Sequence, residues 1–350
     1  MDRNMHDRPS RSHPNHARHR ADPPCRPCRP WGRLATRGFT LVELLVVVAI
    51  IALLIGLLLP ALGRAQRAAK SLNDSANISQ IHKGFLTYAN SDPKGRLPLP
   101  GLIRRASVPG AGNNGAAAFV PGQGEEQQNQ NNTANLYSSM IAKNFITTDI
   151  LISPVEENPV VKLKSDYNFN SFNPAGTGDA FGPFHWDASF RANIFAIADG
   201  GATNVCHTSY AHLALIGDRK KFYWNNKASS TRPIMGNRGT HNGAISGTNY
   251  SKSYTLLFHE PKDTWEGNVC YGDNHVNLER SVIPDTVQYE CGSITLKKDN
   301  IYTFSDFATG GCKGMLEGDT WMCIGIGQPS ASVYTCAPES LTDGTLPTGP

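Results

Sequence analysis

The sequence predicts an α+β protein: a long N-terminal membrane-spanning helix, then a globular domain with an antiparallel β-sheet and long loops. Three observations lead to this prediction. An apolar segment runs from Phe39 to Leu59. Helical spacing of apolar residues then continues to about residue 90. Beyond residue 150, short apolar runs alternate with Gly, Pro, Asn and Asp, which is typical of short antiparallel strands.

The segment 39–59 is long enough to cross a bilayer. As a helix rising about 1.5 Å per residue, it reaches about 32 Å. Its single charge, Glu43, lies near one end. A carboxylate in hydrocarbon costs about 2.5–3.5 kcal/mol even on the mild insertion scale, so a membrane helix that carries one usually has a use for it. The run is too long for a secretory signal, and no small-x-small site follows it.

The residues around this start form the motif Arg37-Gly38-Phe39-Thr40-Leu41-Val42-Glu43. It resembles the N-terminus of type IV prepilins and of the pseudopilins of type II secretion, and it predicts a pilin-like fold. The resemblance implies that a prepilin peptidase cleaves between Gly38 and Phe39 and methylates the new amino group. It also implies that Glu43 pairs with the amine of Phe39 on a neighbouring subunit. The alternative is an ordinary signal anchor, which gains nothing from Glu43.

The N-terminal charge supports processing and export. Residues 1–38, the predicted cleaved leader, hold nine Arg, no Lys and three Asp, a formal charge of +6. Because the whole chain is +4, residues 39–350 sum to −2. The basic character belongs to the leader and indicates no nucleic-acid partner. Arginines stay on the cytoplasmic side, so we expect a single-pass protein of the bacterial inner membrane with its C-terminal domain exported to the periplasm or cell exterior.

Residues 60–92 are expected to continue the same helix, beyond Pro60, as an exported amphipathic part. It carries two successive apolar stripes at helical spacing. The first stripe comprises Leu62, Ala65, Ala69, Leu72 and Ala76. The second stripe comprises Ile78, Ile81, Phe85 and Tyr88. Because they lie on nearly opposite sides of the helix, we expect the first to pack against neighbouring subunits and the second against this chain's own domain. An irregular amphipathic helix is the alternative.

The rest of the chain divides by composition. Residues 93–132 are predicted to include a flexible loop rich in Gly, Ala, Asn and Gln, and 133–284 to form the α+β head, beginning with a helix at 133–146. Residues 285–350 are expected to form a Cys-rich C-terminal extension. Expected strands include 195–198, 213–216, 254–258 and 268–271, and residues 267–278 predict a β-hairpin.

That hairpin loosely resembles the last hairpin of the His-x9-Asp-Gly domain found in pseudopilin-like proteins. The chain departs from the pattern, because His259 precedes Asp273 by fourteen positions and Asn274 replaces the Gly. His259, Asp273 and His275 are metal-ligand types and weak candidates for a metal site. Turn formation already explains Asp273, so no metal site is assigned.

No cofactor is predicted; calcium is the one candidate that the resemblance implies, because major pseudopilins carry a calcium-binding loop near the C-terminus. Here the available carboxylates are those of Asp299, Asp306, Glu317 and Asp319, without a dense ligand pattern. The sequence has no Gly-x-Ser-x-Gly elbow, His-Glu-x-x-His pair or phosphate-binding glycine loop, so no enzymatic activity is predicted.

Six cysteines follow the predicted cleavage point, an even number that favours disulfides in an oxidising compartment. The candidates are Cys206, Cys270, Cys291, Cys312, Cys323 and Cys336. We expect the bonds mostly among the last four. Free buried thiols are the alternative.

These observations predict a structural pilin-like or pseudopilin subunit that polymerises through residues 39–90. The expected partners are prepilin peptidase, other pilin or pseudopilin subunits, an inner-membrane secretion or assembly platform and membrane lipid. The alternative is an exported, membrane-anchored binding or enzymatic domain that uses a prepilin-type signal for display.

Overall fold

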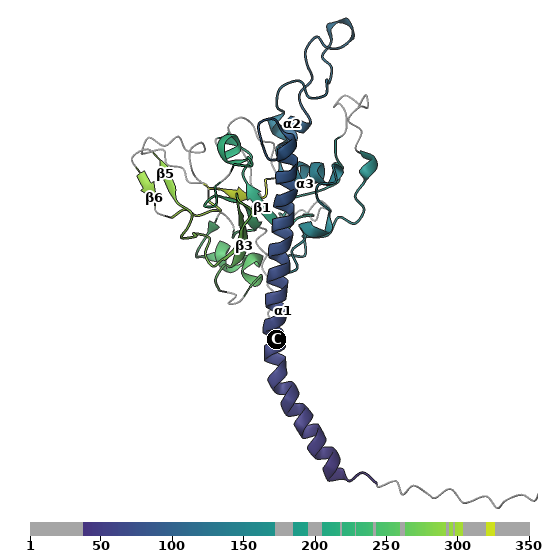
Figure 1. Cartoon of the computed structure of the whole chain (residues 1–350), viewed down its shortest axis with the longest axis vertical. Helices are drawn as coiled ribbons and strands as arrows, with labels where there is room; N and C mark the ends of the chain where they lie inside the picture. Colours follow the sequence, from purple (N-terminus) through teal and green to yellow (C-terminus); the bar gives the residue numbers. More distant parts are fainter. Residues whose placement is uncertain are drawn as a thin grey trace, which may run out of the picture. The chain divides into compact units, whose positions relative to one another are not determined.

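The computed structural model describes residues 38–171, 185–194, 205–217, 219–227, 229–240, 243–259, 263–291, 294–296, 298–303 and 320–325. The chain divides into two units, Met1–Leu58 and Leu59–Pro350. The strand expected at 195–198 lies outside the described residues. The architecture is that of a long helix and a domain with an antiparallel sheet (Figure 1), as the α+β prediction requires.

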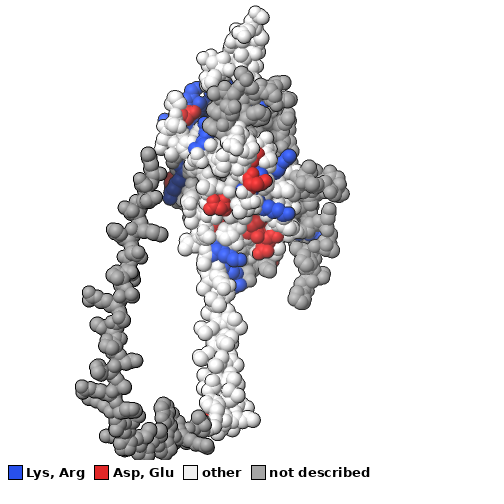
Figure 2. All heavy atoms as spheres, turned by 90° about the vertical axis from the view of Figure 1, so that its right-hand side faces the viewer, with Lys and Arg blue, Asp and Glu red and all other residues white. Residues whose placement is uncertain are grey.

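Helix α1 spans Leu41–Ser91 and continues through Pro60. A proline inside a helix removes one backbone hydrogen bond but does not end this one. In the first unit, every side chain from Leu41 to Leu58 is exposed. By length and composition, α1 is the one helix among the described residues that could cross a membrane. Figure 2 shows its apolar length as an almost unbroken white surface.

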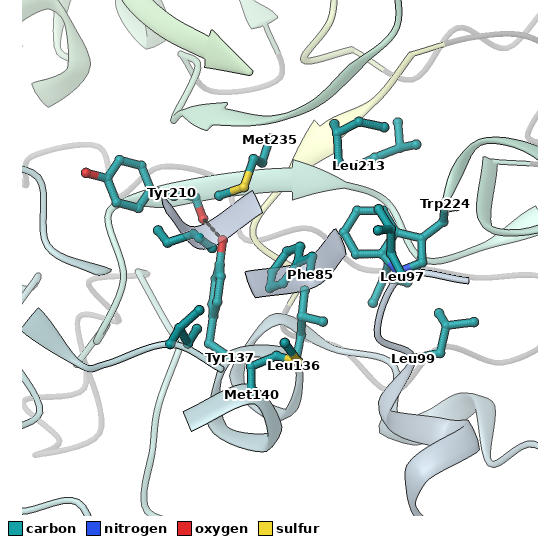
Figure 3. Packing of buried hydrophobic residues seen from close by; sticks show 14 of the residues in the cluster. Phe85, Leu97, Leu99, Leu136, Tyr137, Met140, Tyr210, Leu213, Trp224 and Met235 are labelled. Atoms are coloured by element: carbon teal, nitrogen blue, oxygen red, sulfur yellow. Dashed lines mark hydrogen bonds between the residues drawn. The ribbon is translucent and has the colours of Figure 1, made fainter. Parts of the chain in front are cut away.

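Within the second unit, α1 separates its two apolar stripes as the sequence predicts. Ile78, Ile81 and Phe85 of the second stripe are fully buried in the core of the head. The ring of Phe85 lies 6.1 Å from that of Tyr137 and 5.8 Å from that of Trp224 (Figure 3). All five residues of the first stripe are exposed. Packing of the second stripe against the chain's own domain is therefore confirmed.

The head is built on a five-stranded antiparallel sheet in the order β4-β3-β2-β1-β7. These strands are β1 Tyr210–Leu213, β2 Pro233–Asn237, β3 Gly267–Tyr271, β4 Val276–Glu279 and β7 Met322–Cys323. A separate ribbon pairs β5 Tyr289–Cys291 with β6 Ile294–Leu296. The predicted hairpin is confirmed as β3–β4, and Asn274 takes a φ of 71° in its turn, a conformation that asparagine tolerates.

Both faces of the central strands are buried, so the sheet forms the middle layer of the head. On one face, α1 and α3 (Thr133–Ala142) pack against side chains such as Tyr210 and Met235 (Figure 3). On the other face, a second apolar cluster forms around Val269 and Tyr271. Strands β1 and β7 and the segments that follow β2, β4 and β6 supply the rest of this cluster.

Several sequence expectations need correction. Strand β7 belongs to the segment expected as a separate C-terminal extension, but it pairs with β1 inside the head sheet. The predicted boundary after residue 284 is therefore wrong. The strand expected at 254–258 is instead the 3₁₀-helix η7, Tyr254–Leu257. Strand β1 ends at Leu213, the first residue of the strand expected at 213–216. Burial is continuous from Thr208 to Ile216, so apolar character alone does not show which residues pair with a neighbouring strand.

The segment predicted to include a flexible loop, 93–132, contains defined local structure. It holds α2 (Pro100–Ile103), η1 (Asn113–Gly115) and η2 (Gln128–Gln130). Two backbone hydrogen bonds of 2.8 and 3.1 Å join Val108 and Ala118. The buried Asn131 side chain accepts a hydrogen bond of 2.8 Å from the Gly101 N–H. The glycine-rich composition of this segment does not reveal these hydrogen bonds, because they involve backbone groups and leave no periodic pattern of side chains.

Helix α3 begins at a cap that the sequence makes visible. The Asn132 side chain accepts a 2.9 Å hydrogen bond from the Asn135 N–H. The helix predicted at 133–146 is confirmed, but it ends at Ala142, and Asn144 has a φ of 59°. The remaining short helices among the described residues are η3 Asp149–Leu151, η4 Phe169–Ser171, η5 Arg219–Tyr223 and α4 Thr248–Ser251.

A buried carboxylate connects α1 to three parts of the head. Asp74 is fully buried and accepts hydrogen bonds from Tyr210 Oη at 2.9 Å, from Asn268 Nδ2 at 2.7 Å and from the Ser153 hydroxyl. Burial and the neighbouring Asp74 raise the pKa of Tyr210 well above its usual value, so this hydroxyl remains a donor. The donors come from β1, β3 and the segment after η3, so one carboxylate links all three to α1.

Two buried histidines on the same side of the sheet are kept neutral. Burial lowers the pKa of His82 and of His212 to about 4. His82 Nδ1 lies 3.0 Å from Asn274 Oδ1 in the β3–β4 turn. His212 Nε2 lies 2.8 Å from Thr133 Oγ1, at the start of α3. These two contacts are polar but uncharged, and they lie next to the apolar side chains that α1 and α3 pack against the sheet.

We expect Asp74→Ala to lower the free energy of unfolding of the head by about 2–4 kcal/mol, because three buried donors lose their acceptor. Near-UV circular dichroism of the full mature chain in detergent, followed through a urea titration, measures this. Asp263→Ala is the matched control, since Asp263 is exposed. Equal midpoints for the two variants would contradict the assigned role of Asp74.

Candidate functional site

The N-terminal motif forms a local hydrogen-bonded structure at the start of α1. Thr40 stands at the cap position, directly before Leu41. The Thr40 N–H donates to Glu43 Oε2 at 2.8 Å, and the Glu43 N–H donates to Thr40 Oγ1 at 3.2 Å. The Thr40 hydroxyl also donates to Glu43 Oε2 at 2.8 Å. This reciprocal pair is a capping box, which satisfies amide donors that the first turn leaves free.

The capping box changes the interpretation of Glu43. The prediction that a plain membrane anchor gains nothing from this residue is wrong, because Glu43 caps its own helix. The signal was present as Thr40-x-x-Glu43, the spacing of a capping box. The Thr40 groups are neutral, so capping supplies hydrogen bonds but leaves the negative charge of the carboxylate without a countercharge.

Gly38 precedes this cap and shows no structural need for glycine. A Cβ added to Gly38 would meet no atom within 4 Å, and its φ lies outside the left-handed region. Phe39, the next residue, is 71% exposed. Neither crowding nor backbone conformation in the described structure therefore explains a glycine at this position.

The structure does not bring His259, Asp273 and His275 together as a ligand set. The Asp273 carboxylate and the His275 ring contact each other within the β3–β4 turn, and His275 stacks on Tyr271 with ring centres 4.5 Å apart. His259 lines a groove beside Asn268 and Leu278. Within the described ranges, no group of three or more His, Cys, Asp or Glu side chains could hold a metal ion.

The calcium candidates are only partly described. The Asp299 side chain is buried and accepts a 2.8 Å hydrogen bond from the Thr320 N–H, which fixes the approach to β7. Asp306, Glu317 and Asp319 lie outside the described residues. The contacts of Asp299 therefore support a structural role for its side chain, and the described residues do not test calcium binding.

Cys206 and Cys270 are free buried thiols, so the prediction of disulfides at these two positions is wrong. Burial raises the pKa of Cys206 to about 12 and raises that of Cys270 as well, which keeps both thiols protonated. Their nearest polar groups are not thiols: Cys270 Sγ lies 3.4 Å from His82 Nδ1, and Cys206 Sγ lies 3.1 Å from the Thr208 carbonyl. Cys323 is disulfide-bonded, to a partner beyond the described side chains.

Among the described cysteines, alkylation of the denatured, non-reduced mature chain should label Cys206 and Cys270 and leave Cys323 unlabelled. Alkylation of the folded chain should label neither Cys206 nor Cys270, because the thiols are buried and protonated. Peptide mass spectrometry identifies the labelled positions. A disulfide between Cys206 and Cys270, or rapid labelling of either in the folded chain, would contradict this assignment.

Comparison with known proteins supports the N-terminal assignment. A family model described as the prokaryotic N-terminal methylation motif matches residues 33–59. This range includes Gly38, Phe39 and Glu43 and the apolar part of α1 that follows. No curated protein and no solved structure matched the chain. The match supports a prepilin-type signal on a membrane-anchored, exported protein.

Proposed function

We propose that the chain is a structural pilin-like or pseudopilin subunit that assembles through α1 into an envelope filament of a type II secretion or type IV pilus-like system. One observation carries the proposal: a prepilin-type motif opens a helix whose apolar surface is uncovered. Every side chain from Leu41 to Leu58 is exposed. The first stripe is exposed too, with Leu62 at 54% and Leu72 at 73%.

The first step proposed is cleavage between Gly38 and Phe39 by prepilin peptidase, with methylation of the new amine. Gly38 supports this step because the fold itself makes no use of its small size. A peptidase that must fit the residue before the scissile bond supplies the missing reason. Residues 38–40, the described residues before α1, are exposed and therefore accessible to such an enzyme.

Assembly then covers the apolar surface of α1. Transfer of a leucine side chain from water to an apolar contact stabilises by about 1.5–3 kcal/mol, so the exported first stripe favours contact with neighbouring helices. Lipid covers the membrane segment in the single subunit. An inner-membrane assembly platform would bring the subunits together, with the head exported.

Glu43 is proposed to set the axial position of each subunit. Within one chain, the Glu43 carboxylate is hydrogen-bonded to Thr40, and Phe39 lies before this cap, outside α1. Between staggered subunits, the Glu43 carboxylate and the Phe39 amine can meet. An ion pair in a low-dielectric layer neutralises the charge that the capping box leaves uncompensated, and an unpaired charge there is strongly unfavourable.

The exported display domain is the second candidate. A pocket lined by cationic side chains in the head favours it, because a purely structural head has no need of such a pocket. Failure of the assembly tests below, with a folded head, would favour this second function.

Intact-mass analysis of the membrane form is expected to show loss of residues 1–38 and the addition of one methyl group to Phe39. A Gly38→Ala variant should be processed better than Gly38→Leu, because the peptidase must accommodate the side chain before the cleaved bond. A mature chain that begins at Met1 or Met5 would contradict processing.

Two substitutions separate the two roles of Glu43. Glu43→Gln keeps a capping oxygen but removes the charge, whereas Glu43→Ala removes both. If the ion pair sets the register, both variants should insert and be cleaved but should lose the ladder of cross-linked subunits. Cysteines introduced at Leu62 and Leu72 on the first stripe report this ladder on a denaturing gel.

Glu125→Gln, a change of an exposed carboxylate in the head, is the matched control and should keep the ladder. A wild-type ladder from Glu43→Gln with none from Glu43→Ala would assign Glu43 to capping alone. A wild-type ladder from Glu43→Ala would contradict assembly through the Glu43 pair.

A further inference from the structure

A pocket of about 740 Å³ lies in the head between the segment that follows α1 and the segment that contains η5. We name it the basic pocket. Residues within 94–102 and 216–227 form its two main walls, and residues within 126–128 add to the lining. Its volume is that of a typical site for a small ligand.

Positive charge is concentrated in the basic pocket. Its described lining has one carboxylate, Glu126, against five cations: Lys94, Arg96, Lys220, Lys221 and Lys227. The exported chain as a whole is −2 by formal charge. This excess in one concavity therefore contrasts with the rest of the molecule and attracts anions.

Only two of the five cations are neutralised by ion pairs with described residues. Lys220 Nζ lies 2.8 Å from Glu126 Oε1, and Arg96 Nη2 lies 2.8 Å from Asp92 Oδ2. Lys94, Lys221 and Lys227 form no ion pair within the part of the chain that the structure describes. All three are exposed at the pocket, so their ammonium groups can meet a ligand.

The walls are held in place by direct hydrogen bonds. The Asn226 N–H donates to the Gly95 carbonyl at 2.8 Å, and the Leu97 N–H donates to the Trp224 carbonyl at 3.2 Å. Trp224 is fully buried, and its indole N–H donates to the Pro98 carbonyl at 2.8 Å. Figure 3 shows Trp224 beside Leu97 in the core. The pocket is thus largely pre-formed, which reduces the entropy lost on binding.

The lining also offers apolar surface. Leu99, Leu102 and Ile216 contribute aliphatic groups, and Phe222 contributes a ring that is 54% exposed. The Lys221 ammonium lies 4.6 Å from the centre of this ring. A cation beside an accessible aromatic face suits a ligand that combines a negative group with a flat or apolar part.

We propose that the basic pocket binds a small organic ligand that carries phosphate or carboxylate groups next to an apolar face. The cations surround one concavity whose described lining has a single exposed aromatic side chain, whereas non-specific single-stranded nucleic-acid sites combine a long charged groove with several stacking rings. Binding in this pocket is independent of filament assembly, because none of its lining belongs to α1.

Isothermal titration of the full mature chain in detergent with phenyl phosphate tests the proposal, since this probe has both a dianionic group and a ring. We expect saturable binding that weakens as salt is raised. Replacement of both Lys221 and Lys227 by Gln should weaken binding about five- to tenfold at low ionic strength. The double variant Lys83→Gln and Lys162→Gln, at exposed positions outside the pocket lining, should leave it unchanged.

Glu126→Gln should change the affinity for phenyl phosphate in the opposite direction from the lysine substitutions. It removes the carboxylate and frees Lys220, and it keeps an oxygen that can accept the 2.6 Å hydrogen bond from Asn131. Affinity for phenyl phosphate should therefore rise about two- to fivefold. A folding defect would not weaken binding in one variant and strengthen it in the other.

Three results would overturn the proposal. The first is an absence of phenyl phosphate binding at low salt by the folded mature chain. The second is equal weakening by the pocket and control lysine variants. The third is pocket-dependent binding of a single-stranded DNA oligonucleotide without binding of phenyl phosphate, which would assign the pocket to nucleic acid.

Discussion

Burial of one face of α1 in the head is the interaction on which the rest of the domain depends. Ile78, Ile81 and Phe85 fill the space between the sheet and α3, and their contacts extend to Trp224. Without this helix, the side of the sheet that faces α1 would expose its apolar residues to water. The helix is therefore an internal part of the head's core as well as the carrier of the apolar N-terminal segment.

Apolar packing alone does not fix how far a helix can slide along a sheet, since the hydrophobic effect is not directional. The buried polar contacts of α1 supply that direction. Asp74 meets Tyr210 and Asn268 near one end of the buried face, and His82 meets Asn274 two turns later. A shift of one residue would break both sets of contacts and leave buried polar groups unsatisfied. The head thus holds α1 in one register.

The sequence was most informative where a long or periodic pattern exists. The apolar run 39–59, the two stripes of α1 and the β3–β4 hairpin follow from spacing that local physics determines. Pairing between distant segments was not predictable in this way. Strand β7 has only two residues, and its partner β1 lies more than a hundred positions earlier. The thiols Cys206 and Cys270 are free because of where the fold places them.

Other features left a signal that was not recognised. Asp74 lies four residues before Ile78 on the same helix face, so its burial follows from the same spacing. The spacing of Thr40 and Glu43 in the sequence is that of a capping box. The basic pocket was concealed because its cations come from residues 94–96 and 220–227, which the fold brings together, and because the net charge of the exported chain is slightly negative.

The central claim is that α1 is both the core helix of the head and the polymerisation element of a filament. Cryo-electron microscopy of assemblies purified from native membranes tests it most directly. The account predicts a helical array in which the first stripe, with Leu62 and Leu72, contacts α1 of adjacent subunits, and in which each Phe39 amine lies beside a neighbour's Glu43. Isolated single subunits, or an array in which the heads touch while the first stripe faces solvent, would contradict it.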